Sequence, residues 1–205
     1  MTILNKGDII NRIYSKKELE RLVITPLIDD DQIGSGTVDL RLGTSFIMFK
    51  SRKIGTIDPP TETPEKIKEY QEEVIYQHGK KFILQPTQFV LGGTLEYLKL
   101  PSDLLAYVVG RSSWGRLGLI IETSPIVHPC FMGVLTFELS NLGTAPIALY
   151  PGSRSAQISF HKSDDKTYED CKKKLSQSRY NLTVKPEFSK IYMDKDLKKI
   201  QNIYK

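Results

Sequence analysis

Residues 110–119, which read GRSSWGRLGL, concentrate the side chains best suited to binding an anion. Two arginines, Arg111 and Arg116, stand five positions apart and bracket the hydroxyls of Ser112 and Ser113. Guanidinium groups, hydroxyls and the backbone amides of a glycine-rich turn are the donors that a polyphosphate requires. Strand-like apolar segments lie on both sides of the run, and the run itself suggests a phosphate cradle.

A single carboxylate, Glu138, lies in the otherwise uncharged segment 134–140. Strand alternation places it on one face with Thr136 and Ser140, and the apolar residues on the other. The residues alone leave two interpretations open. Glu138 could be an ordinary solvent-facing glutamate, or a buried carboxylate that takes a proton from water and returns it to a leaving amine. Together with a phosphate cradle, the second interpretation suggests nucleotide chemistry.

The chain lacks the motifs of several other chemistries. No Gly-x-Ser-x-Gly elbow accompanies the serines, and there is neither a Walker loop nor a Gly-x-Gly-x-x-Gly run. Pro129-Cys130 is not followed by a second cysteine three residues on, and no His-x-Glu exists, so we expect no zinc site. Two cysteines, Cys130 and Cys171, are too few for a disulfide framework and lack paired metal spacing.

The composition predicts one domain with a basic C-terminal tail. A chain of 205 residues that is 40% hydrophobic can bury a real core. Residues 161–205 hold 12 Lys and Arg against 7 Asp and Glu, and so carry the whole net charge of +5. This tail could fold over a polyphosphate, grip nucleic acid, or be a solvated mobile end. Since no run approaches the roughly 18 apolar residues of a membrane span, and no signal peptide is recognisable, we expect a cytoplasmic protein without membrane contact.

The elements that position these residues are predicted to be mainly β. Many short strands separated by turn residues indicate a barrel or sandwich rather than βαβ units. Apolar positions over residues 9–22 repeat at helical spacing and predict an N-terminal helix. Residues 51–80 are expected to form a loop that leaves the core, and residues 166–175 suit a short helix. The expected strands cover residues 37–43, 46–49, 81–84, 88–91, 94–98, 104–109, 117–121, 134–140, 147–149 and 156–160.

The order and spacing of these segments resemble the dCTP deaminase branch of the trimeric dUTPase superfamily. The resemblance rests on residues 110–119 followed by 133–138, and it extends over nearly the whole chain. It implies a distorted dUTPase-like, jelly-roll-like β-barrel over residues 1–160, with an N-terminal helix, and a basic C-terminal lid over residues 161–205. It also implies a homotrimer with active sites shared between neighbouring subunits. The other matching segments are 37–43, 89–97, 100–101, 151–152, 156–160, 179–180 and 186–194.

The same resemblance implies hydrolytic deamination of dCTP to dUTP and ammonia. Glu138 and Ser112 are the implied catalytic residues, with Glu138 activating the water that attacks C4 of cytosine without a transition metal. Mg²⁺ would accompany the triphosphate, and a lid would close over the phosphates and exclude water. The implied substrate-binding residues are Arg111, Ser113, Arg116, His128, Thr136, Gln157 and, on the lid, Tyr168, Arg179 and Tyr180.

The chain departs from the family pattern before the glutamate strand and in the lid. His128 stands where the family usually carries an aspartate that contacts the sugar and orients the hydrolytic water, which argues against pyrophosphate cleavage. His128 could instead donate to a sugar hydroxyl, or be only a turn residue. In the lid, Thr183 stands where a phosphate-binding glutamine is common, and Lys185 replaces a glycine and could supply charge to the phosphates.

Two other functions therefore stay open. A bifunctional dCTP deaminase and dUTP diphosphatase, or a dUTPase, is disfavoured by His128. A catalytically weakened homologue that binds or senses nucleotides is favoured by the altered loop at 122–132 and opposed by the presence of Glu138. Nucleic-acid binding by the tail is a more distant alternative.

Overall fold

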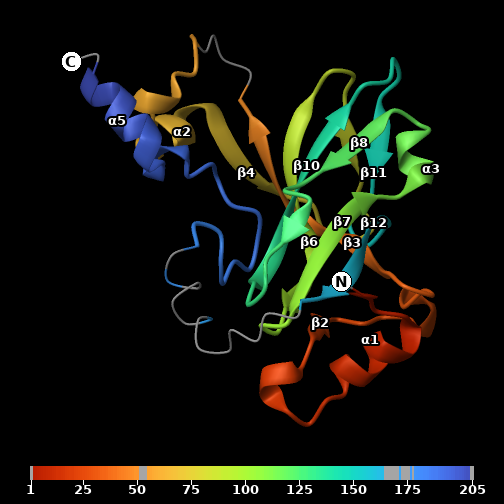
Figure 1. Ribbon diagram of the computed structural model, residues 1–205. Coiled ribbons are helices and arrows are strands. Elements are labelled where there is room, and N and C mark those ends of the chain that lie inside the picture. Colours follow the sequence, from red (N-terminus) through yellow and green to blue (C-terminus); the bar gives the residue numbers. More distant parts are fainter. Residues whose placement is uncertain (1, 51–54, 164–170, 172–175, 177, 204–205) are drawn as a thin grey trace.

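The computed structural model describes residues 2–50, 55–163, 171, 176 and 178–203 (Figure 1). Its strands are β1 (Thr2–Ile3), β2 (Val23–Thr25), β3 (Val38–Phe49), β4 (Gln71–Ile75), β5 (Phe82–Leu84), β6 (Phe89–Lys99), β7 (Leu104–Gly110), β8 (Leu119–Glu122), β9 (Ile126–Val127), β10 (Met132–Asn141), β11 (Ile147–Leu149) and β12 (Arg154–Lys162). Its α-helices are α1 (Lys6–Ile13), α2 (Pro64–Tyr70), α3 (Ser112–Gly115) and α5 (Lys195–Ile203). Short 3₁₀ turns are η1 (Glu18–Glu20), η2 (Asp30–Gln32), η3 (Pro59–Thr61) and η5 (Ile191–Met193).

Ten strands form one curled sheet, which confirms the prediction of a mainly β, barrel-like fold. Its main path runs β8-β10-β6-β3-β12-β7-β9, and β1, β2 and β4 pair with β12, β6 and β3 respectively. Strands β5 and β11 form a separate two-stranded sheet. Figure 1 shows α3 on one side of the sheet, and α2, α5 and the C-terminal segment on the other.

The core fills the inside of the curl. Phe46 and Phe82 stack with ring centroids 4.9 Å apart, and both are fully buried. Along β10, Phe137 and its apolar neighbours Leu135 and Leu139 are buried, as the alternation predicts. A strand with one apolar and one polar face buries only the first, so the polar face of β10 remains for a binding site.

The N-terminal helix is shorter than predicted. Asn5 caps α1 with a complete capping box, but the helix ends at Ile13. Leu19 then lies in η1 with 69% of its surface exposed, whereas Leu22 is buried just before β2. The apolar residues at helical spacing therefore belong to α1, to η1 and to the segment just before β2. Among the described residues, no helix has both the length and the apolar character needed to span a bilayer.

Two further expectations about the strands are wrong. The expected excursion at 51–80 contains α2, which buries Ile67, and β4, which pairs with β3 over residues 71–75. The predicted pairs of strands at 37–49 and at 88–98 are each one continuous strand, β3 and β6. Their pairing changes register between Leu42 and Phe46, so an irregularity within the ladder replaces the predicted turn.

A buried polar cluster fixes β3 against β6 near the start of β3. The carboxylate of Glu96, which is fully buried, accepts hydrogen bonds from the Arg41 backbone N at 2.8 Å and from Gln32 Nε2 at 2.9 Å. Gln32 Nε2 also donates to the backbone oxygen of Asp39 at 2.9 Å. Burial raises the pKa of the Glu96 carboxyl above its ordinary value, although its donors oppose the effect.

Candidate functional site

The predicted phosphate cradle is a single helical turn, α3, at the end of β7. Arg111 is its N-cap residue, and the Arg111 backbone N donates to Ser155 O on β12 at 3.0 Å. The side chains of Ser112, Ser113 and Arg116 are exposed. Two guanidinium groups and two hydroxyls therefore share one short turn that faces solvent, where they can reach an anionic group.

Two contacts hold this turn on the sheet. Trp114 Nε1 donates to the backbone oxygen of Arg154 on β12 at 2.9 Å. Gly118 has φ +91°, and a Cβ at this position would lie 2.8 Å from Gly143 N, so the close approach requires glycine. The Leu142 backbone N donates to Gly118 O at 2.9 Å across the same approach. Gly118, near the end of the sequence motif, thus allows the chain after α3 to pack against Gly143.

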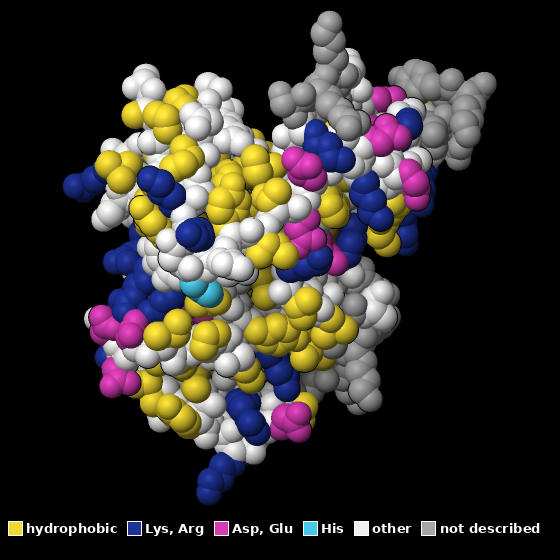
Figure 2. All heavy atoms as spheres, turned by 180° about the vertical axis from the view of Figure 1, so that it is seen from behind, with side chains coloured by type: hydrophobic (Ala, Val, Ile, Leu, Met, Phe, Trp, Pro, Cys, Tyr) yellow, Lys and Arg dark blue, Asp and Glu magenta, His cyan; other side chains and the backbone are white. Residues whose placement is uncertain are grey.

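A cavity of about 830 Å³ lies between the exposed side of β10, the loop after β8 and residues 178–189 near the C-terminus. Its walls are mainly apolar and include Phe49, Phe89, Leu91, Phe131 and Leu135. Figure 2 shows one face of the molecule on which hydrophobic side chains gather, with Lys and Arg side chains beside them. A concave, mainly apolar chamber with a few polar groups at its edge is the usual form of a small-molecule site.

Four of the predicted site residues line this cavity together, namely His128, Thr136, Glu138 and Tyr180. Glu138 lies opposite Leu91 on β6 and Glu122 on β8. Its side chain is exposed in the single chain, so one copy alone does not bury the carboxylate. The exposed carboxylate nevertheless faces the cavity, where a bound molecule would cover it.

Five other predicted site residues lie elsewhere in the chain. Arg111, Ser112, Ser113, Arg116 and Gln157 do not line the cavity, and α3 lies across the sheet from the C-terminal segment (Figure 1). Gln157 is on β12, in register with Asp39 on β3. One chain therefore carries the predicted site residues in two separate groups, one at the turn of α3 and one around an apolar cavity with a carboxylate.

Residues 178–189 form a C-terminal strap that closes one side of the cavity. Four hydrogen bonds fix the strap to β10. Met132 N donates to Asn181 Oδ1 at 2.9 Å, and Leu182 N donates to Met132 O at 2.6 Å. Val134 N donates to Thr183 O at 2.8 Å, and Thr183 Oγ1 donates to Val134 O at 2.8 Å. Thr183 is buried, and its hydroxyl fastens the strap to β10.

Lys185 also fastens the strap, against the expectation that it supplies charge to phosphates. Its Nζ donates to Glu73 Oε2 on β4 at 2.5 Å, and Ser45 Oγ donates to Glu73 Oε1 at 2.8 Å. Burial alone would raise the pKa of Glu73, but the hydrogen bonds from Lys185 and Ser45 outweigh it and lower the pKa below its ordinary value. The next residue, Pro186, packs on Gly93, where a Cβ would lie 2.8 Å from the proline ring.

The other predicted lid residues are held within the C-terminal segment. Arg179 Nη2 pairs with Asp194 Oδ2 at 2.9 Å, and this hydrogen bond holds the pKa of Asp194 below its ordinary value. The hydroxyl of Tyr180 accepts from the backbone N of Lys190 at 2.7 Å. The predicted Tyr168, like most of the expected helix at 166–175, lies outside the described residues.

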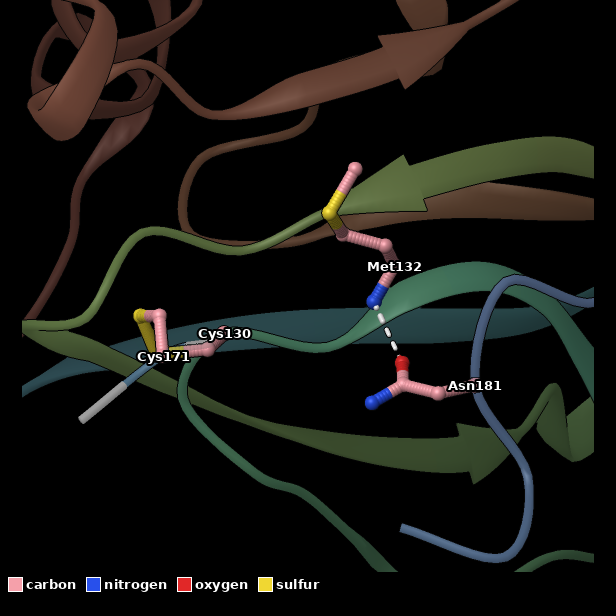
Figure 3. The surroundings of a disulfide bond; sticks show 4 residues. All are labelled: Cys130, Met132, Cys171 and Asn181. Atoms are coloured by element: carbon pink, nitrogen blue, oxygen red, sulfur yellow. Dashed lines mark hydrogen bonds between the residues drawn. A yellow bond between two sulfur atoms is a disulfide. The ribbon is translucent and has the colours of Figure 1, made fainter. Parts of the chain in front are cut away.

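A disulfide that the sequence analysis missed joins Cys130 to Cys171, with Cα atoms 5.3 Å apart (Figure 3). Cys130 is buried in the turn that follows His128, two residues before the strap contact at Met132. The disulfide therefore links Cys171, which precedes the strap in the sequence, to the turn after His128 at the wall of the cavity. A sequence separation of 41 residues gives no local signal for such a pairing.

Comparison with known proteins agrees with the resemblance seen in the sequence. A family model described as dCTP deaminase-like matches residues 3–163. A protein of Methanobrevibacter smithii named dCTP deaminase, dUMP-forming, is 42% identical over 180 residues, covering 87% of this chain and 92% of that protein. A Haloarcula marismortui protein named dCTP deaminase is 42% identical over 197 residues, covering 95% of this chain and 97% of that protein.

Among solved structures, the 2'-deoxycytidine 5'-triphosphate deaminase of Agrobacterium tumefaciens is similar in fold. It aligns with a TM-score of 0.59 and 25% sequence identity over 77% of this chain. The chain spans 46% of the length of that structure's chain.

Proposed function

Since this chain belongs to the dCTP deaminase-like family, we propose that it removes the exocyclic amine of dCTP by hydrolysis, forming dUTP and ammonia. The observation that carries the proposal is the position of Glu138. It is a carboxylate on the polar face of β10, beside a cavity whose apolar walls suit a pyrimidine ring.

Glu138 acts on the water that attacks C4 of the cytosine ring. The carboxylate accepts a proton from water as the hydroxide oxygen bonds to C4, and it returns that proton to the exocyclic nitrogen. The C4–N bond then breaks and ammonia leaves, so one water and one dCTP give one dUTP and one ammonia. The neighbouring His128 and Thr136 line the same cavity and offer donors to the sugar and base.

The triphosphate binds at α3 of a neighbouring copy of the chain. Arg111, Ser113 and Arg116 donate to phosphate oxygens, and Ser112 holds the catalytic water. Because α3 and the cavity lie apart within one chain, one active site needs two copies, which a closed homotrimer supplies at each of its interfaces. Arg179 and Tyr180 would reach the phosphates only after the Arg179–Asp194 pair opens.

Magnesium enters with the nucleotide in this proposal. The donors of α3 are cationic or hydroxyl groups, which fit phosphate oxygens that carry a bound cation. Among the residues that the structure describes, no group of three or more His, Cys, Asp and Glu is placed to hold a metal ion. Mg²⁺ would neutralise part of the triphosphate charge, and the chain's own residues bind and orient the nucleotide.

A second candidate, which also hydrolyses dUTP to dUMP and pyrophosphate, is favoured by the dUMP-forming name of the Methanobrevibacter smithii relative. We favour dUTP as the final product because His128 stands at the position where the family's water-orienting aspartate is expected. A neutral imidazole can donate to the sugar, but it lacks the negative charge that orients a water toward a phosphorus atom.

The test is to incubate the purified protein with dCTP, dUTP, dCMP or CTP and Mg²⁺ and to resolve the products by chromatography. We expect dUTP from dCTP and no product from dUTP. Formation of dUMP and pyrophosphate would support the bifunctional candidate. Nucleotide binding without turnover would leave only a binding or sensing protein.

Sharing of the site is tested by mixing two inactive variants, Glu138→Gln and Ser112→Ala. Random reassembly into trimers should restore about a quarter of the wild-type rate, because each site takes Glu138 from one copy and Ser112 from its neighbour. Absence of any recovery, with exchange of subunits verified, would contradict the shared site.

A further inference from the structure

Asp39 is a buried carboxylate next to two residues predicted to bind the substrate, yet nothing so far assigns it a role. It is 7% exposed and lies on β3, which β12 separates from β7 and α3. Its Oδ1 accepts a hydrogen bond from Gln157 Nε2 at 3.0 Å. Its Oδ2 accepts from Arg154 Nη1 at 3.2 Å and lies 3.8 Å from Arg111 Nη1.

Arg154 and Arg111 depend on Asp39 to different degrees. Arg154 Nη2 also contacts Asp29 Oδ2 at 3.0 Å and Asp31 Oδ1 at 2.5 Å, so it keeps two carboxylates if Asp39 loses its charge. For Arg111, Asp39 is the only carboxylate partner within the described part of the chain. The backbone of Arg111 is already fixed to Ser155, so the carboxylate is what directs the free end of the guanidinium group.

We infer that Asp39 is a positioning residue for the triphosphate, acting through Arg111 and Gln157. It holds both donors toward one point before the nucleotide arrives, so less side-chain freedom is lost on binding. When the triphosphate binds, the other N–H groups of the Arg111 guanidinium donate to the phosphates while Nη1 stays beside Asp39, and Arg154 continues to neutralise the carboxylate. This inference rests on the proposed function, because it assumes that Arg111 receives a triphosphate.

Two other roles of Asp39 would give different results. A carboxylate 3.8 Å from Arg111 also competes with phosphate for the guanidinium group. If competition dominated, loss of the charge would tighten nucleotide binding. If Asp39 only held the fold together, loss of the charge would lower the melting temperature and leave the kinetics of the folded protein unchanged.

The experiment compares Asp39→Asn with the matched control Asp31→Asn, which removes a carboxylate that contacts Arg154 but not Arg111. For Asp39→Asn we expect KM for dCTP and the Kd of inorganic tripolyphosphate to rise about tenfold, with kcat within about twofold of wild type. Asp31→Asn should leave all three values within about twofold. Unchanged or lower KM and Kd values in Asp39→Asn would overturn the inference.

A double-mutant cycle with Arg111→Gln tests whether Asp39 acts through Arg111. Adding Asp39→Asn to Arg111→Gln should raise KM by less than Asp39→Asn does in the wild type, because only the contact with Gln157 remains to be lost; effects that multiply in full would contradict the inference. If Asp39→Asn does not fold, Asp39→Glu takes its place in the same cycle, with an expected rise in KM of at least about threefold. A wild-type protein that neither binds nor deaminates dCTP would overturn the proposed function itself, whereas an active wild type matched by Asp39→Asn would overturn only the inference.

Discussion

Gly133 is the point where the C-terminal strap crosses β10, and we expect Gly133→Ala to lift the strap from the cavity. A Cβ at Gly133 would lie 2.7 Å from Thr183 Oγ1, 3.0 Å from Thr183 N and 3.1 Å from Thr183 O. Two of these atoms belong to the backbone, so the strap cannot escape by rotating a side chain. The backbone of Gly133 also has φ +147°, a conformation that an alanine rarely adopts.

The cost of lifting the strap follows from the bonds that it would break. Four hydrogen bonds join residues 181–183 to Met132 and Val134. At about 1 kcal/mol net each, their loss amounts to at most about 4 kcal/mol. This would lower the protection of the Leu182 and Val134 amides against hydrogen exchange by up to about a thousandfold. The free energy of global unfolding should change much less, because the hydrophobic core of the described residues contains no residue of the strap.

The assay is amide hydrogen exchange, with KM for dCTP measured in parallel. Gly79→Ala is the matched control, because Gly79 also has a left-handed φ, +80°, but no atom lies within 4 Å of a Cβ added there. Gly133→Ala should lose protection at the strap and raise KM, and Gly79→Ala should do neither. Equal protection in Gly133→Ala and wild type, or the same loss in both variants, would refute this account of the strap.

Three further predictions concern single contacts. Cys171→Ser removes a disulfide that closes a loop of 41 residues, and should lower the free energy of unfolding by at most about 4 kcal/mol. Denaturation of the wild type with and without a reducing thiol checks this, and equal midpoints would contradict it. The lowered pKa of Asp194 means that its pair with Arg179 stabilises the segment above the ordinary value of 3.8 and is lost as pH falls through the lowered pKa. An NMR pH titration should therefore show this acid transition in the wild type and not in Asp194→Asn. Trp114→Phe removes the hydrogen bond to Arg154 O and should lower the free energy of unfolding, measured by urea denaturation, by about 1 kcal/mol. An unchanged midpoint would show that this hydrogen bond does not hold α3 on the sheet.

Local patterns predicted the strands that matter most for the site. Alternation along 134–140 correctly placed Phe137 in the core and Glu138 on the opposite face, because a strand repeats every two residues. The glycine-rich turn after β7 was recognised from residue types alone. Alternation could not say what covers the polar face of β10, and so it left the exposure of Glu138 open.

Contacts between distant residues were beyond the reach of these patterns. Lys185 and Glu73 are 112 positions apart, and nothing in either segment indicates an ion pair between them. Likewise, nothing in the residues around Thr183 indicated that its backbone pairs with β10. Helical spacing over 9–22 failed beyond Ile13, where the helix ends: Leu19 is exposed in η1, and Leu22 is buried against the core outside any helix.

The most direct test of the central claim is the Glu138→Gln variant, assayed for both dCTP binding and ammonia release. Glutamine keeps the shape of the side chain but cannot accept a proton from water at neutral pH. We predict a Kd for dCTP within about threefold of wild type and a deamination rate lower by at least about a hundredfold. A variant that deaminates dCTP at the wild-type rate would contradict the role of Glu138 and the proposed chemistry of the cavity.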